Sequence, residues 1–432
     1  MKRSISNVVF ILLLLMLTLS AWQKEVNLLE ESELHGFFKP AEPAPSLTSF
    51  AWPRWFSGEF QQQITANLEN HIGFRKTLFR VQNEVDYRLF RIIHAQGFVQ
   101  GKKGYIFEED YIHEYLGRYF VGPVILDDKL QKLDKVSRVL GEAGIQFVLV
   151  FEPGKASFYP EHIPSRYQPH LRTESNYTYI LRRSADLGIP TMNLNSYFLQ
   201  MKDTTRYPLF PKYGMHWSIY GSVVAMDTLF RYVEAATATD LPAITISDVE
   251  VSYSMRWTDK DIGELLNLIL PLQGEKLAYP RLDFDTTAPR KLSVLVIADS
   301  YYINIIHNCS GQLFKNHEYW YYNSKLYPDI MDDRNPVYVD KTNLKEKLLS
   351  FDMVLLMVSE INMHCGFWNF ADEAYLAFHP DAPDPPWYPY QNSILTNREW
   401  FNYMVSKART NNISTGDAII RDAKFIYNSK NH

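Results

Sequence analysis

The stretch from Lys291 to Tyr302, KLSVLVIADSYY, decides the fold. An apolar run rich in Val, Ile and Leu ends abruptly in Asp299-Ser300, and a helical pattern follows. Such an uninterrupted apolar run is typical of a parallel strand that is buried on both faces. In open α/β sheets the functional site lies at the carboxyl ends of the strands. The pattern therefore places Ser300 at a strand-to-helix turn, where its hydroxyl can be exposed.

Ser300 has two interpretations. The first is a nucleophile, since the N–H groups at the start of the following helix can stabilise a developing anion. The second is a helix cap, because Asp and Ser both favour that position. A second stretch, FPKYGMHWS over residues 210–218, favours the nucleophile because it supplies His216 as a general base in an irregular loop. A lone histidine is often structural, so the hypothesis depends on the two residues meeting.

The composition excludes several classes of protein. The chain of 432 residues is longer than one typical domain. Its 46% apolar and 22% charged residues are ordinary for a globular protein that can bury a core. The net charge of −5 argues against a nucleic-acid partner. The 28 Tyr residues slightly favour a carbohydrate partner, because Tyr gives a sugar an apolar face and a polar tip, although a Tyr-rich surface explains them equally. Cys309 and Cys365 form no metal-binding spacing, so we expect neither a metal nor another cofactor; they either pair or remain buried thiols.

The N-terminus carries a targeting signal. A basic leader, Met1-Lys2-Arg3, precedes the apolar run from Val8 to Trp22. A run of this length suits a signal peptide or a short anchor. We therefore interpret residues 1–22 as a signal peptide or inner-membrane anchor and residues 23–54 as a polar linker. Both alternatives place the remaining chain in the periplasm or cell envelope.

The region from 55 to 363 alternates helix and strand patterns. It begins with two helices within 56–90 that are separated at Gly73, and a hairpin over 98–107 follows. The expected strands are 146–151, 191–194, the strand before Ser300 and 353–358, and the expected helices are 130–143, 173–187 and 220–235. This alternation predicts a parallel sheet with helices on both faces. Residues 240–290 read as an insertion, and residues 364–432 read as a C-terminal extension with a helix near 399–408.

Two short motifs resemble a known family. They are His216-Trp217-Ser218 with Gly221, and Ala298-Asp299-Ser300 further along the chain. With the serine strand after the histidine loop, these motifs resemble the SGNH-hydrolase-like domain of the alginate O-acetyltransferase AlgJ/AlgX (DHHW) family. The resemblance covers about residues 55–362 and implies a circularly permuted SGNH fold, a three-layer sandwich around a parallel sheet, with helical additions.

The resemblance also implies an activity. It points to an extracytoplasmic, serine-dependent O-acetyltransferase that acts on a cell-surface or secreted polysaccharide and receives acetyl groups from a membrane-bound O-acyltransferase. A carbohydrate acetyl esterase would use the same residues, because only the acceptor of the acyl-enzyme differs. A polysaccharide-binding protein that keeps the fold without strong catalysis is a third alternative.

One position departs from the family pattern. Gly214 stands where the Asp-x-His-Trp motif has the Asp that completes a triad. Either Ser300 and His216 act as a dyad, or a backbone carbonyl or another acid such as Glu360 replaces the Asp. Losing the orienting acid can cost about 10⁴-fold in turnover. If no carboxylate replaces it, Gly214→Asp should restore a triad.

The remaining site residues have supporting roles in this interpretation. The oxyanion hole is expected to combine the Ser300 backbone N–H with the side chain of Asn362, which follows the 353–358 strand. Glu360 and Asp299 lie at the same strand ends as supporting residues, and Trp217 is expected to fix the histidine loop by packing.

Overall fold

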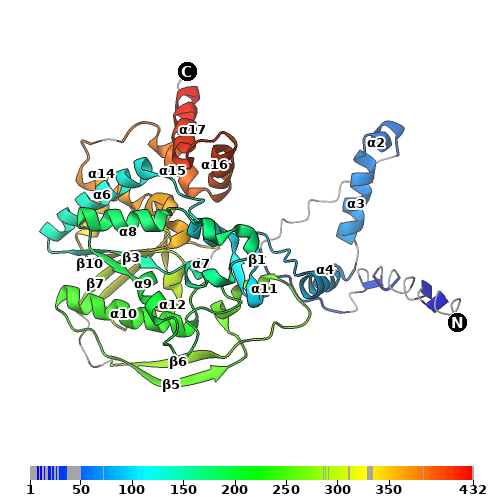
Figure 1. Cartoon of the computed structure of the whole chain (residues 1–432), viewed down its shortest axis with the longest axis horizontal. Helices are drawn as coiled ribbons and strands as arrows, with labels where there is room; N and C mark the ends of the chain where they lie inside the picture. Colours follow the sequence, from blue (N-terminus) through cyan, green and yellow to red (C-terminus); the bar gives the residue numbers. More distant parts are fainter. Residues whose placement is uncertain are drawn as a thin grey trace. The chain divides into compact units, whose positions relative to one another are not determined.

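The computed structural model describes most of the chain beyond residue 50. The described residues are 29–36, 50–71, 73–285, 287, 289, 291–309, 312–327, 334–382 and 384–430, together with scattered positions before residue 27. They form two compact units (Figure 1). One contains Met1–Gln96 with Ile262–Leu272, and the other contains Gly97–Asp261 with Gln273–His432.

The first unit contains the two helices expected within residues 56–90. These are α3 (Glu59–His71) and α4 (Arg75–Val85), which continues as a π-helical turn, η1 (Asp86–Phe90). The short helix α2 (Trp52–Phe56) precedes them. The Asn83 amide donates a hydrogen bond to the carbonyl of Leu266 at 2.9 Å, which ties the segment 262–272 to α4. Much of the proposed signal or anchor and of the linker lies outside the described residues, and no described helix is long and apolar enough to cross a membrane.

A six-stranded sheet forms the centre of the second unit. Its order is β4 (Thr191–Asn193), β3 (Gln146–Glu152), β10 (Met353–Ser359), β7 (Ser293–Ala298), β8 (Asn316–Tyr321) and β9 (Lys325–Tyr327). The first five strands are parallel, but β9 pairs antiparallel with β8. The expectation of a wholly parallel sheet is therefore wrong at this edge. A short turn joins β8 to β9, and such a connection allows only antiparallel pairing.

The apolar runs are continuous because helices cover both faces of the sheet. Successive residues of a strand point to opposite faces. In β3, Val148 and Val150 belong to the core on one face, whereas Phe147, Leu149 and Phe151 belong to the core on the other. The first core includes α10 (Ile219–Thr237) and α12 (Tyr301–Cys309), and the second includes α6 (Pro123–Glu142) and α8 (Asn176–Leu187) (Figure 1).

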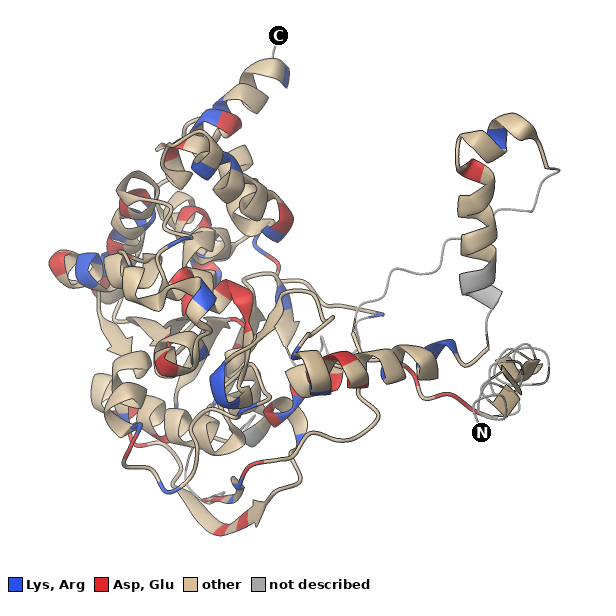
Figure 2. Cartoon of the chain, turned by 45° about the vertical axis from the view of Figure 1, so that its right-hand side comes forward, with Lys and Arg blue, Asp and Glu red and all other residues tan. Residues whose placement is uncertain are grey.

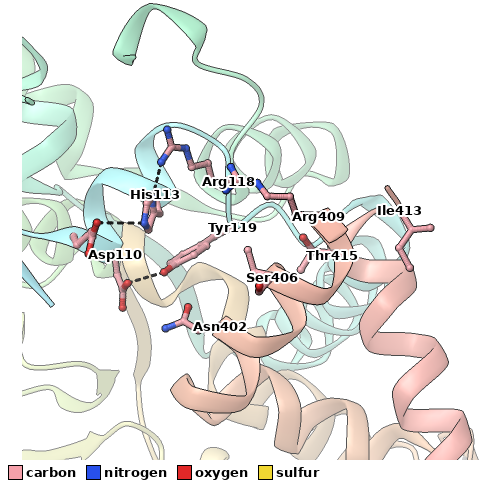
Figure 3. A pocket seen from close by; sticks show the side chains of 12 residues that line it. Asp110, His113, Arg118, Tyr119, Asn402, Ser406, Arg409, Ile413 and Thr415 are labelled. Atoms are coloured by element: carbon pink, nitrogen blue, oxygen red, sulfur yellow. Dashed lines mark hydrogen bonds and ion pairs between the residues drawn. The ribbon is translucent and has the colours of Figure 1, made fainter. Parts of the chain in front are cut away.

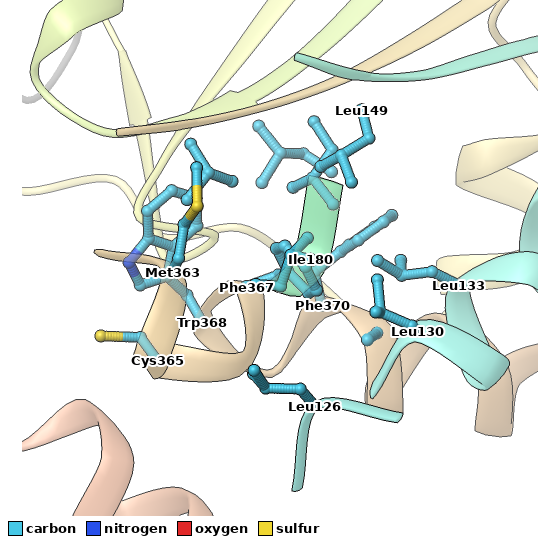
Figure 4. Packing of buried hydrophobic residues seen from close by; sticks show 14 of the residues in the cluster. Leu126, Leu130, Leu133, Leu149, Ile180, Met363, Cys365, Phe367, Trp368 and Phe370 are labelled. Carbon is cyan, nitrogen blue, oxygen red and sulfur yellow. The ribbon is translucent and has the colours of Figure 1, made fainter. Parts of the chain in front are cut away.

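The C-terminal extension joins the second core. Figure 4 shows Phe367 and Phe370 packing with Leu130 of α6 and Leu149 of β3. η8 (Glu360–Asn369) leads into the extension, and α14 (Phe370–Phe378), α15 (Tyr388–Thr396), α16 (Arg398–Thr410) and α17 (Thr415–Lys430) follow. Phe401 and Ile419 are fully buried there, so α16 and α17 belong to the same packed unit. Cys365 is a buried free thiol, and the side chain of Cys309 lies outside the described part of the chain.

The remaining elements position the site. The hairpin expected over residues 98–107 is confirmed as β1 (Phe98–Gln100) and β2 (Ile106–Glu108). The expected insertion contains a second antiparallel hairpin, β5 (Ile244–Ser252) and β6 (Leu277–Phe284). The other short helices are α5 (Glu109–Tyr115), α7 (Lys155–Phe158), α9 (Leu194–Met201), α11 (Asp261–Leu265) and α13 (Leu344–Leu348). Basic and acidic residues are interspersed over the elements in Figure 2, in agreement with the small net charge.

Candidate active site

The structure brings Ser300 and His216 together. Ser300 lies two residues after the end of β7 and directly before α12, so it is at the expected strand-to-helix turn. Its Oγ is 2.8 Å from Nε2 of His216, although the residues are 84 positions apart. This is the distance at which a histidine can accept the proton of a serine hydroxyl.

The loop that carries His216 is fixed by the start of α10. Ser218 caps this helix, since its Oγ accepts a hydrogen bond from the Gly221 N–H at 2.9 Å. A Cβ on residue 221 would lie 2.3 Å from the Leu209 carbonyl oxygen, so only glycine fits. Trp217 is fully buried and packs edge-on against Tyr301, with ring centroids 5.0 Å apart, in line with its expected packing role.

Asp261 is the acid beside His216. Its Oδ2 is 3.0 Å from His216 Nδ1, and its Oδ1 accepts the Met215 N–H at 2.8 Å. Asp261 begins α11, in the excursion between β5 and β6 that the sequence reading treats as an insertion. Ser300, His216 and Asp261 thus have the geometry of a Ser-His-Asp triad.

Gly214 makes room for the relocated acid. A Cβ at this position would lie 2.2 Å from the Thr258 carbonyl oxygen and 2.6 Å from Pro211 Cγ. No side chain fits there, because the segment leading to Asp261 occupies the space. The Gly214→Asp prediction applied only if no carboxylate replaced the missing Asp, and Asp261 does replace it. A side chain at residue 214 would push away the segment that carries Asp261.

The surroundings of His216 favour its protonated form. Burial by itself lowers the pKa of His216, but the hydrogen bond and the charge of Asp261 raise it more, so the pKa lies above its ordinary value. Asp261 therefore stabilises the imidazolium that forms when His216 accepts a proton.

Lys155 also holds the loop that carries His216. Its ammonium group is buried and donates hydrogen bonds to the carbonyls of Gly214 at 2.7 Å and Lys212 at 3.0 Å. Burial lowers the pKa of Lys155 to about 7. This contact fixes the backbone two residues before His216.

Asp299 ties the ends of two strands together. It accepts hydrogen bonds from the Tyr301 N–H at 3.1 Å and the Ser359 hydroxyl at 2.6 Å. The Asn362 amide also donates to Asp299, at 2.8 Å, and lies 3.2 Å from Ser359 Oγ. The structure thus shows Asn362 bracing Asp299, and its role as an oxyanion donor stays a prediction.

Glu360 does not contact His216. It is buried and accepts hydrogen bonds from Ser157 and Asn195. Burial raises the pKa of Glu360 to about 7. The suggestion that Glu360 replaces the missing Asp is therefore wrong, and Asp261 takes that position.

Tyr322 is a further polar group at the nucleophile that the sequence reading missed. Burial raises the pKa of Tyr322 well above its ordinary value, although the nearby Ser300 hydroxyl acts to lower it, so the Tyr322 hydroxyl keeps its proton. Tyr322 has a left-handed backbone, with φ of 50°, at the turn after β8. Its only sequence signal is the aromatic run EYWYY, which did not predict the turn.

The described residues contain no group of three His, Cys, Asp or Glu side chains that could hold a metal ion. The site offers a serine hydroxyl, a histidine base with an orienting acid, and hydroxyl and backbone donors nearby.

Together with this geometry, part of the chain is similar to known proteins. Residues 98–294 match the family model of the SGNH hydrolase-like domain of acetyltransferase AlgX. The match confirms the resemblance to the AlgJ/AlgX family over this range. It includes His216 and Asp261 and ends within β7, just before Ser300.

One curated relative is the probable alginate O-acetylase AlgJ of Pseudomonas aeruginosa. It is 27% identical over 200 residues, which are 46% of this chain and 49% of AlgJ, so the match spans about half of the relative's length. Among solved structures, the O-acetyltransferase domain of Pseudomonas putida AlgJ has a TM-score of 0.43 at 16% identity, covering 62% of this chain and 92% of that one. Bacillus cereus PatB1 with a sulfonyl adduct has a TM-score of 0.41 at 13% identity, covering 63% of this chain and 99% of that one.

Proposed function

We propose that the chain is an extracytoplasmic O-acetyltransferase that acetylates hydroxyl groups of a cell-surface or secreted polysaccharide. The observation that carries the proposal is the hydrogen-bonded series from Asp261 through His216 to Ser300. His216 and Asp261 lie within the region that matches the AlgX domain model, and Ser300 follows it. The basic leader and apolar run of residues 1–22 support a location in the periplasm or cell envelope, with this segment as signal peptide or inner-membrane anchor.

The first half-reaction loads the enzyme. Ser300 Oγ attacks the carbonyl carbon of the acetyl donor while His216 Nε2 takes the hydroxyl proton. Asp261 keeps the His216 ring oriented and stabilises its positive charge. The C–O bond to the leaving group breaks, the leaving group takes the proton from His216, and acetyl-Ser300 remains. The Ser300 N–H and the Tyr322 hydroxyl are our candidates for stabilising the oxyanion, with Asn362 as the alternative donor.

The second half-reaction transfers the acetyl group. A sugar hydroxyl attacks the acetyl-Ser300 carbonyl, His216 takes its proton, and that proton returns to Ser300 Oγ as the ester bond to Ser300 breaks. A membrane-bound O-acyltransferase is the donor that we propose. If water replaced the sugar, the same residues would act as an esterase, which is the second candidate. The alternative of a non-catalytic binding protein depended on the missing acid at Gly214. Asp261 supplies that acid, so this reason no longer applies.

Product analysis tests this proposal. Wild-type protein is incubated with an activated acetyl ester and an oligosaccharide acceptor, and acetylated oligosaccharide and free acetate are quantified. We expect acetylated oligosaccharide with the wild type and none with Ser300→Ala. Free acetate as the only Ser300-dependent product, at every acceptor concentration, would show an esterase and refute the transferase.

A further inference from the structure

Glu152 is a buried carboxyl group that the proposed mechanism does not use. It is the last residue of β3 and is fully buried, at the same edge of the sheet as Ser300 (Figure 1). No group in the described part of the chain donates a hydrogen bond to either oxygen of its side chain. An ionised carboxylate in such surroundings would lose its hydration without compensation, so this position needs a physical explanation.

The pocket between α5 and α16 does not reach this carboxyl group. The pocket has a volume of about 520 Å³ (Figure 3). Its lining includes Asp110, Tyr119 and Asn402, but neither Glu152 nor Asp299. That pocket therefore offers Glu152 no water, and the side chains packed against Glu152 decide its charge.

Glu152 meets Asp299 across the end of β10. Ser359 of β10 is the register partner of Glu152, so both side chains lie on the same face of the sheet. Ser359 also donates twice to Asp299 Oδ2, from its N–H at 3.1 Å and from its hydroxyl at 2.6 Å. The two carboxyl groups thus lie on either side of Ser359. Burial and then the charge of Asp299 raise the pKa of Glu152 well above its ordinary value of 4.5.

Asp299 holds the negative charge of this pair. Its oxygens accept four hydrogen bonds, from the Tyr301 N–H, the Asn362 amide and the two donors of Ser359. Each of these bonds favours the ionised form of Asp299. Glu152 has no such donor. A proton on Glu152 therefore neutralises the group that lacks donors and gives Asp299 a further one.

Among the described residues, the other titratable groups that face Glu152 are neutral. They are the hydroxyls of Tyr301 and Tyr319, whose pKa values burial raises well above the ordinary value. The charged groups that follow the neighbouring strand ends bind elsewhere. Lys155 donates to backbone carbonyls of the histidine loop, and Glu360 accepts hydrogen bonds from neutral side chains. No cation is thus placed to balance an ionised Glu152 within this part of the chain.

We propose that Glu152 is a positioning residue, whose neutral carboxyl group donates a hydrogen bond to Asp299 and so holds the turn that carries Ser300. The inference rests on the proposed function and adds a residue on which that reaction depends. Asp299 precedes Ser300 and binds the N–H of Tyr301 after it, so fixing Asp299 fixes the backbone on both sides of the nucleophile. An ionised Glu152 would instead repel Asp299.

Proton linkage tests the neutral state of Glu152 in the full-length chain. The unfolding equilibrium constants of wild type and Glu152→Gln are measured in urea at several pH values above 4.5, the ordinary pKa. A carboxyl group that is neutral in the fold and ionised in the unfolded chain makes the wild type less stable as pH rises, whereas glutamine does not titrate. We expect the constant of the wild type to rise about tenfold per pH unit relative to Glu152→Gln, until pH reaches the raised pKa. A ratio that does not change with pH would show that Glu152 is ionised in the fold and would overturn the inference.

Acylation of Ser300 by p-nitrophenyl acetate tests the positioning role. Glu152→Gln should keep much of the wild-type rate, because its amide can donate to Asp299. Glu152→Met lacks a donor and should acylate about tenfold more slowly, as for a lost hydrogen bond to a charged group. The control Glu142→Met changes an exposed glutamate at the end of α6 and should have no effect.

Equal rates for Glu152→Met and Glu142→Met would overturn the inference, as would a folded Glu152→Gln that acylates as slowly as Glu152→Met. Either result with a normally acylating wild type leaves the proposed function standing. A wild type that is not acylated refutes the proposed function. The ratio of unfolding constants needs neither a reaction nor Glu152→Met, so it decides the protonation of Glu152 in every case.

Discussion

Replacing Asp261 by Asn removes one charge from the triad and keeps the size of the side chain. The Met215 N–H lies 2.8 Å from Oδ1 and needs an acceptor, so the Asn carbonyl oxygen should occupy that position. The Asn amide then faces His216 Nδ1 and donates to it. His216 would be held with its proton on Nε2, where it cannot accept the proton of Ser300.

The expected loss is about 10⁴-fold in the acylation rate, which corresponds to about 5 kcal/mol of transition-state stabilisation. The assay is the burst of p-nitrophenol from p-nitrophenyl acetate, followed by stopped flow. Asp283→Asn is the matched control, because it removes the same charge from an exposed position on β6. An Asp261→Asn variant that is folded and acylates at the rate of Asp283→Asn would refute the assignment of Asp261.

Three further predictions concern the loop that carries His216 and its contacts. Because Asp261 holds the pKa of His216 above its ordinary value of 6.5, acylation should increase as pH rises through that higher pKa, and Asp261→Asn should move the midpoint to lower pH; an unmoved midpoint would contradict this coupling. By the same sign, the pair stabilises the fold fully below about pH 6.5, and this contribution is lost as pH rises through the folded-state pKa. Gly214→Ala should destabilise the fold by about 1–3 kcal/mol in urea unfolding and slow acylation, whereas Gly141→Ala, whose Cβ meets nothing within 4 Å in α6, should be neutral or stabilising; equal effects would contradict the argument from space. Lys155→Met should leave the Gly214 and Lys212 carbonyls without their donor and cost about 1–3 kcal/mol with slower acylation, while the exposed Lys102→Met should change neither; an unaffected Lys155→Met would show that the loop is held by other contacts.

The sequence predicted the elements whose pattern is set by burial. The runs that became β3, β7 and β10 are apolar throughout because both sheet faces are covered, so they could be recognised without knowing their neighbours. The strand β8, NHEYWY, was missed because it begins with polar residues and three of its six residues are only partly buried. The antiparallel edge at β9 depends on the turn at Tyr322 and Asn323, whose left-handed backbone has no glycine to announce it.

The residues of the site also fall into those that the sequence predicted and those that it did not. Ser300 and His216 could be predicted because each lies in a recognisable motif at a strand end or loop. Asp261 could not, because its contact with His216 spans 45 residues and depends on how the excursion between β5 and β6 folds back. Gly214 did signal a change at the triad, but as a missing acid. Only the short distance from residue 214 to the Thr258 carbonyl shows that glycine leaves space for an acid from elsewhere.

Trapping of the acyl-enzyme tests the central claim most directly. The wild-type chain is mixed with an activated acetyl ester, quenched in acid and digested, and the peptides are analysed by mass spectrometry. The account predicts one added acetyl group on the peptide that contains Ser300, absent from Ser300→Ala and strongly reduced in Asp261→Asn. Folded wild-type protein that gains no acetyl group on Ser300, or gains it equally in Asp261→Asn, would contradict the account.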